Sequence, residues 1–262
     1  MTQQILEDHR ELWKKKPVLR AIYADFYRRI LSACRPGRSL EIGGGFGNLK
    51  EYAGNVVSTD LVPVPGLDAV ADAQALPFRE SSFDNIVAVD VLHHIERPQR
   101  FFSEADRVLR PGGRVILVEP GVTALSWIFY KLLHPEPLIL KADPFTEGPL
   151  DPNRKPFDAN QAIPELVFGR YLQCFESKFP SLKLVQRERF SWLVYPLSGG
   201  FRSWSLIPGR LLKTLLATER KLAPLIVWLA AFRLFLVIEK MDLSNVTAIA
   251  TANERDQQLN RE

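Results

Sequence analysis

Four glycines within five residues follow an acid in the stretch E-I-G-G-G-F-G at positions 41–47. Glycine has no Cβ, so Gly43, Gly45 and Gly47 allow a sharp turn and a close approach of the backbone to a ligand. The dinucleotide fingerprint G-x-G-x-x-G would need a third glycine at position 48, where this chain has Asn48. An acid, Glu41, before G-x-G-x-G instead suits a ligand that carries a positive charge and no phosphate.

A second acid stands at the spacing of a ribose-binding carboxylate. Asp60 ends a predicted buried strand over residues 55–60, roughly twenty residues after the first motif, where nucleotide-binding α/β folds place such a group. The alternative is a structural one, because Asp at a strand end often accepts hydrogen bonds from nearby backbone amides.

Three histidines are candidates for a general base. His93 and His94 follow a predicted strand, and His134 stands next but one to Glu136. Histidine titrates near neutral pH, which suits proton transfer. Adjacent side chains point in different directions, so at most one of His93 and His94 is expected to face a substrate while the other bonds to the protein.

Several elements must position these residues. Strand patterns over 39–42 and 55–60 are followed by the segments A-D-A-Q-A-L-P-F at 71–78, S-F-D-N-I-V-A-V-D-V-L-H-H-I at 82–95 and R-V-L-R-P-G-G-R-V-I-L-V-E-P at 107–120. In this order the chain resembles the class I S-adenosylmethionine-dependent methyltransferases, and within them the broad "methyltransferase type 11" group, from about Ser39 to Pro120. The resemblance implies a doubly wound, mostly parallel seven-stranded α/β sheet in the order 3-2-1-4-5-7-6, with the last strand antiparallel and helices on both faces.

The same resemblance implies S-adenosylmethionine as cofactor and assigns residues to it. Asp72 would accept a hydrogen bond from the adenine amino group, and the Ala73 amide would face the ring nitrogen. The cofactor-binding residues implied are Glu41, Gly43, Gly45, Gly47, Asp60, Asp72, Ala73 and Asp90. No metal is expected, and a base is needed only for a hydroxyl or acidic carbon acceptor.

One methyltransferase domain is predicted over residues 1–243. It divides into an N-terminal helical cover (1–37), a cofactor-binding half (38–120), a variable lid and acceptor region (121–180), and C-terminal strands and a helix (181–243). The polar tail 244–262 is predicted to be disordered. Six prolines between 135 and 156 favour a loop that closes over the site.

Periodicity predicts the remaining elements. We expect a covering helix over 11–34, a helix over 123–133, a helical segment over 160–175 and a strand over 182–195. A helix over 210–231 is expected to lead into a last strand over 233–240. After Asp60, Pro63 and Pro65 forbid a helix and predict a loop.

Composition is typical of a cytoplasmic enzyme. The chain has 262 residues, 46% of them hydrophobic, and a net charge of +4 without a basic run, so nucleic acid is not expected as a partner. Its two cysteines lack metal-ligand spacing, and its start lacks the features of a secretory signal. The apolar stretch 222–238 is short for a membrane span and is interrupted by Pro224 and Arg233, which leaves peripheral membrane contact as the alternative.

The sequence leaves the acceptor open among sugars, lipid-linked intermediates, quinone-like rings and small metabolites. The apolar C-terminal half favours an amphiphilic or lipid-linked acceptor. Two other functions stay open: a non-catalytic protein that binds S-adenosylmethionine and serves a partner, and a nicotinamide-dependent oxidoreductase, against which Asn48 argues.

Overall fold

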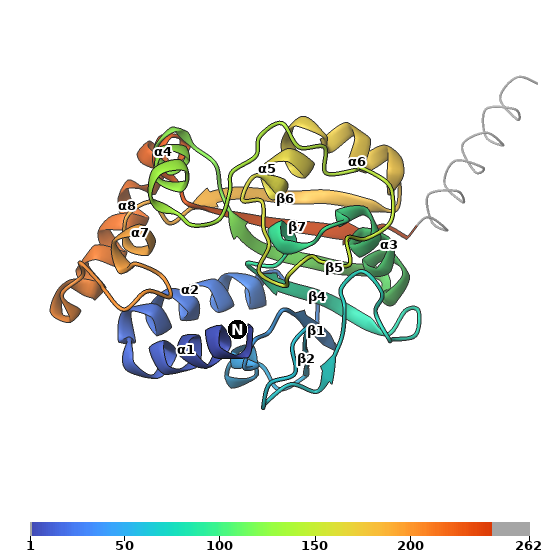
Figure 1. The fold of residues 1–262 in the computed structure, drawn as a ribbon, viewed down its shortest axis with the longest axis horizontal. Helices are drawn as coiled ribbons and strands as arrows, with labels where there is room; N and C mark the ends of the chain where they lie inside the picture. Colours follow the sequence, from blue (N-terminus) through green and yellow to red (C-terminus); the bar gives the residue numbers. More distant parts are fainter. Residues whose placement is uncertain (1, 243–262) are drawn as a thin grey trace, which may run out of the picture.

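A computed structural model describes residues 2–242, and the predicted polar tail lies outside them. Its centre is a seven-stranded sheet in the order β3-β2-β1-β4-β5-β7-β6, covered by helices on both faces (Figure 1). The strands are β1 (Ser39–Ile42), β2 (Val56–Asp60), β3 (Ala69–Val70), β4 (Phe83–Val89), β5 (Leu109–Pro120), β6 (Leu182–Phe190) and β7 (Arg233–Lys240). β7 runs antiparallel to β5 and β6, and the other pairings are parallel. The predicted strand order is confirmed.

The central strands are apolar on both faces because helices cover both sides. Successive side chains of β5 alternate between two cores: Val115 and Leu117 pack in one, and Ile116 and Val118 in the other. The first core includes residues of α3 (Pro98–Val108) and α6 (Leu172–Lys178), and the second includes residues of α2 (Pro17–Ala33). Both cores fix the sheet edge at which β1, β2 and β4 end.

The other helices are short or lie toward the ends of the chain. They are α1 (Thr2–Lys15), η1 (Asn48–Glu51), η2 (Leu92–His94), α4 (Ala124–Leu133), α5 (Ile163–Glu165), η3 (Leu166–Arg170), α7 (Val194–Ser198), η4 (Gly209–Leu211) and α8 (Leu212–Ala230). The helical segment predicted over 160–175 is found from Ile163 onward, divided among α5, the π-helical η3 and α6. Residues 135–156 contain neither helix nor strand, as their prolines predicted.

The single covering helix predicted over 11–34 is in fact two helices. The break lies at Lys16, because Pro17 has no amide proton to continue α1 but suits the first position of α2. The Lys16 ammonium donates to the carbonyls of Gly200, Arg202 and Trp204 at 2.7, 2.8 and 2.9 Å. These contacts attach the corner of the helical cover to the loop between α7 and η4.

The strand predicted over 182–195 ends earlier, at Phe190. Ser191 takes a positive φ of 55°, and the Glu219 carboxylate of α8 accepts the amides of Leu193 and Val194 at 2.7 and 3.1 Å. These contacts turn the chain into α7.

The C-terminal helix and last strand lie where the sequence placed them. α8 runs to Ala230 and β7 begins at Arg233. Among residues 2–242, no helix combines the length and apolar character that a membrane crossing requires.

Candidate active site

A cavity of about 650 Å³ lies at the edge where β1, β2 and β4 end, a volume typical of small-molecule sites. Its walls come from three parts of the chain: the first two helices, the loops that follow those strands, and the segments 129–136, 150–157 and 195–204. Every residue that the sequence singled out as catalytic, and every cofactor candidate except Gly47, lines this cavity.

Three glycines of the turn after β1 differ in how closely other protein atoms surround them. Gly43, Gly45 and Gly47 have φ values of 64°, 55° and 71°, a region that favours glycine. A Cβ on Gly45 would meet no atom within 4 Å, whereas one on Gly43 would lie 2.3 Å from Val91 Cγ2 and one on Gly47 would lie 3.0 Å from the Gly66 carbonyl oxygen. The protein's own packing therefore requires glycine at positions 43 and 47. At Gly45, by contrast, the space that a side chain would enter is empty of protein atoms.

Glu41 is buried under this turn. Its carboxylate accepts the Ser58 hydroxyl from β2, and burial raises the pKa of Glu41 to about 7. A Cβ on Gly44 would lie 2.3 Å from Ser58 Oγ and 2.6 Å from Glu41 Oε2. Gly44, to which the sequence assigned no role, is needed to make room for this acid.

Asp60 is placed for both roles that the sequence suggested, a structural one in the turn and a ligand-binding one. Its Oδ2 accepts the Gly45 amide at 3.0 Å and its Oδ1 accepts the Val62 amide at 3.1 Å. Each carboxylate oxygen can accept a second hydrogen bond, and Asp60 lines the cavity beside Asp72 and Ala73. The carboxylate holds the turn and keeps capacity for a ligand.

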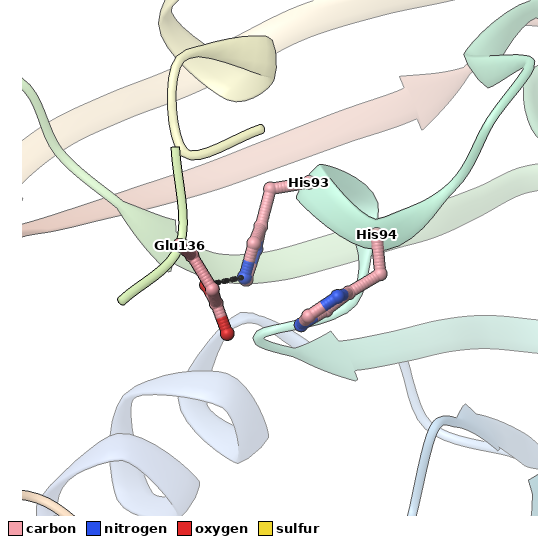
Figure 2. Close-up of side chains that lie close together, drawn as sticks. All are labelled: His93, His94 and Glu136. Carbon is pink, nitrogen blue, oxygen red and sulfur yellow. Dashed lines mark ion pairs between the residues drawn. The ribbon is translucent and has the colours of Figure 1, made fainter. Parts of the chain in front are cut away.

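His93 lies between two carboxylates. Its Nδ1 is 2.7 Å from Glu119 Oε2, and its Nε2 is 3.6 Å from Glu136 Oε2; Figure 2 shows the pair with Glu136 as a dashed line. Burial alone would lower the pKa of His93, but the two carboxylates outweigh it and raise the pKa to about 9. The ring is therefore protonated near neutral pH and is not a free base.

His94 has the opposite electrostatics. Burial and the charge on His93 lower the pKa of His94, so its ring is neutral near pH 7. Its Nδ1 lies 3.4 Å from the Asp158 carbonyl oxygen, which favours the tautomer that leaves Nε2 as an acceptor. The rings of His93 and His94, both on η2, lie 4.2 Å apart between centroids (Figure 2). Ligand atoms of these two rings and of Glu136 all lie within 4.8 Å of one another, and the ion pairs of His93 account for this proximity.

His134 is the third candidate. Its Nδ1 accepts the Glu136 amide at 3.3 Å, and burial lowers its pKa. Its ring stacks edge-on against Tyr130 of α4. His134 and His94 are both neutral near pH 7. Because His134 Nδ1 accepts the Glu136 amide, the proton of that ring lies on Nε2. His94 is therefore the histidine whose Nε2 stays an acceptor, and it is the best placed as a base.

Comparison with known proteins identifies the part of the chain that carries the glycine-rich turn. The family model described as "Methyltransferase domain" matches residues 40–117, which span β1 to β5 in the strand order reported above. Residues 40–117 therefore belong to a class I S-adenosylmethionine-dependent methyltransferase domain. S-adenosylmethionine is therefore its cofactor.

Curated relatives match over limited stretches. The ubiquinone/menaquinone biosynthesis C-methyltransferase of Ruegeria sp. is 34% identical over 110 residues, which cover 33% of this chain and 44% of that protein. Phthiotriol/phenolphthiotriol dimycocerosates methyltransferase 1 of Mycobacterium ulcerans is 44% identical over 67 residues, or 24% of this chain and 25% of that protein. The chain thus spans less than half the length of these two relatives in the matched region.

A solved structure extends the similarity of the methyltransferase fold over most of the chain. A Galdieria sulphuraria protein, provisionally named a sarcosine dimethylglycine methyltransferase, is 16% identical and aligns with a TM-score of 0.51 over 90% of this chain and 99% of its own. At this identity the similarity concerns the fold alone.

The methyltransferase site also contains residues that the sequence did not reveal. Arg233, at the start of β7, is buried and pairs with Asp90 through its two Nη atoms, one of them at 2.7 Å. The guanidinium lies 3.9 Å from the ring centre of Tyr195. The Asp90 carboxylate, expected to bind the cofactor, is thus engaged by Arg233, from a strand far along the chain.

Two further groups at or beside the cavity were missed. Glu119, at the end of β5, accepts the amides of Val91 and Leu92 as well as His93 Nδ1; its place at a strand end was the available signal. His9, to which the sequence assigned no role, lines the cavity and stacks on Phe201 at 4.4 Å. No local pattern links residues 9 and 201.

The described residues fit the cofactor of this domain. The open space at Gly45, the free acceptor capacity of Asp60 and the buried acid Glu41 lie at one end of a cavity of suitable volume.

Proposed function

We propose that this protein transfers a methyl group from S-adenosylmethionine to an amphiphilic acceptor, a lipid-linked molecule or a quinone-like ring. The observation that carries the proposal is that one cavity joins the glycine-rich turn and Asp60 to the neutral His94. Cofactor groups and a candidate base thus open into the same space.

The chain's own residues position and deprotonate the acceptor. S-adenosylmethionine supplies the activated methyl group when bound. His94 Nε2 accepts the proton of a hydroxyl or acidic carbon, and the charged His93 stays fixed by Glu119. Holding two reactants in line contributes up to roughly 7–11 kcal/mol to lowering the barrier in well-oriented systems.

The aromatic part of the cavity lining suits an acceptor with an aromatic or apolar portion. It includes Trp13, Phe129, Tyr195 and Trp204. The two curated relatives are named for acceptors in ubiquinone or menaquinone biosynthesis and for phthiotriol dimycocerosates, which supports a lipophilic class. The region 121–180, together with 195–204, then forms the acceptor end.

Turnover tests the proposal. Purified protein with methyl-labelled S-adenosylmethionine is incubated with lipid extracts, quinols and water-soluble metabolites, and label in the organic phase is measured. We expect label in a lipid or quinol product. Cofactor binding without transfer to any fraction would favour the non-catalytic alternative, and label only in water-soluble products would contradict the amphiphilic acceptor.

A further inference from the structure

One end of the molecule carries a group of exposed apolar side chains. Figure 1 shows α4, α7 and α8 together at this end, away from β1 and β2. The most exposed large apolar side chains on these elements, which we call the apolar patch, are Leu132 and Leu133 of α4, Leu206 of the loop that precedes α8, and Leu225 and Trp228 of α8, each between 60% and 72% exposed. Large apolar residues gathered in this way mark an interaction surface.

The exposed charges on the segments that carry the patch all have one sign. Exposed basic residues on the same elements are Lys131, Arg202, Arg210, Lys213, Arg220 and Lys221. Within the described segments 121–134 and 198–231 the one acid is Glu219, which is buried. Apolar side chains surrounded by Lys and Arg are typical of surfaces that bind anionic lipid headgroups and insert leucine and tryptophan into the interface.

This charge pattern disfavours a second copy as the occupant. In a symmetric dimer the same patch would face itself, and its cations would then meet cations with no exposed acid from these segments to pair with them. An anionic surface instead complements them.

The patch is continuous with the wall of the cavity. Arg202 donates to the Leu133 carbonyl oxygen at 3.0 Å, which ties the loop to the end of α4. Arg202 and Trp204 of this loop and Phe129 and His134 at α4 also line the cavity. A surface that covers the patch therefore lies next to the acceptor end.

We propose that the apolar patch and its basic residues dock the protein onto an anionic lipid surface. Docking is independent of methyl transfer; the further step, that the acceptor enters the cavity from this surface, rests on the proposed function.

Vesicle flotation of the full chain tests docking. Vesicles of phosphatidylcholine alone are compared with vesicles that also contain phosphatidylglycerol. We expect binding to the anionic vesicles that weakens as salt rises, and little binding to phosphatidylcholine. The double variants Leu225→Ser/Trp228→Ser and Lys213→Glu/Lys221→Glu should each lower the partition coefficient by about tenfold or more.

Matched variants control for composition. Arg79→Glu/Arg100→Glu changes the net charge by the same amount on exposed residues outside the patch, and Val70→Ser removes an exposed apolar side chain of β3. Both should bind vesicles as the wild type does. Docking is overturned if the wild type binds neither vesicle, or if the control variants lose as much binding as the patch variants.

Two more readouts separate the explanations. A wild-type dimer that dissociates in Leu225→Ser/Trp228→Ser, without vesicle binding, would show that a second copy covers the patch and would overturn docking. Calorimetry with S-adenosylmethionine on the same samples separates the two proposals. Vesicle binding without cofactor binding supports docking and contradicts the proposed function. Cofactor binding without vesicle binding contradicts docking and agrees with the proposed function.

Discussion

Two adjacent histidines have opposite protonation because their neighbours differ. His93 Nδ1 contacts Glu119 and its Nε2 faces Glu136, so the ring carries a proton. That positive charge, together with burial, lowers the pKa of His94. In a site with two titratable groups whose pKa values are pushed apart, the neutral one is the base near pH 7.

Replacing His94 by Ala should therefore lower methyl transfer by about 10²-fold, the typical contribution of a general base. Affinity for S-adenosylmethionine should stay within about threefold, because the ring is not assigned to the cofactor. His134→Ala serves as the comparison and should have the smaller effect on rate. A wild-type rate in His94→Ala would exclude this base, and a loss of activity of the wild type in chelator would point to a metal instead.

The buried charge of His93 predicts how stability depends on pH. Its pKa rises from the ordinary 6.5 to about 9 in the fold, so its proton stabilises the folded state fully below pH 6.5, and this contribution is lost as the pH rises through about 9. The melting temperature should fall over that window.

Two variants test this pH dependence of the melting temperature: Glu119→Gln at the ion pair and Glu147→Gln as the control. Glu119→Gln removes the closer carboxylate and should flatten the fall in melting temperature, whereas Glu147 is 78% exposed and its replacement should not. Equal slopes in all three proteins would contradict the assigned ion pair.

At the scale of elements, the glycine-rich turn separates packing from ligand binding. Gly45→Ala adds a methyl group in open space at the cavity wall, with a backbone strain of order 1 kcal/mol from the positive φ. We expect this variant to fold and to bind S-adenosylmethionine more weakly in calorimetry. Full affinity would show that the methyl group meets no ligand.

Gly43→Ala should instead lose stability, because its Cβ would lie 2.3 Å from Val91 Cγ2. The Val91→Ala background should restore part of that loss, as measured by denaturant unfolding. If the double variant is no more stable than the sum of its single changes predicts, the contact with Val91 is not the cause.

Glu219 fixes the turn between β6 and α7. Glu219→Ala leaves the amides of Leu193 and Val194 without their acceptor and should lower the free energy of unfolding by about 1–3 kcal/mol. Glu219→Gln keeps an acceptor oxygen and should cost less, and Thr218→Ala at the neighbouring exposed position should be near neutral. Equal losses for Gln and Ala would contradict this role.

The elements that local patterns control were predicted well, and those set by distant contacts were not. The strand at 233–240 follows from its β-branched and aromatic residues, and the glycine-rich turn from its spacing. The end of β6 depends on Glu219, almost thirty residues away, and the corner at Lys16 is attached to Gly200 and Trp204. Pro17 did offer a local signal for that break.

At the scale of the whole molecule, the residues proposed for the cofactor follow from the sequence, whereas several residues proposed for the acceptor do not. Glu41, Gly45 and Asp60 lie within one stretch whose order resembles a known family. Arg233, Tyr195 and His9 reach the same cavity from opposite ends of the chain, and only the folded sheet brings them together. For the same reason the protonation of His93 was not predictable without Glu119.

The most direct test of the account is calorimetric binding of S-adenosylmethionine to the full chain and to two variants. The wild type should bind, and Asp60→Ala should bind about ten- to a hundredfold more weakly, because hydrogen bonds to a charged group contribute about 1.5–3 kcal/mol each. Asp68→Ala is the control, since Asp68 accepts the Ser58 amide at 2.7 Å but does not line the cavity, and it should bind nearly as the wild type. A wild type that ignores S-adenosylmethionine, or binds NAD in its place, would contradict the central claim.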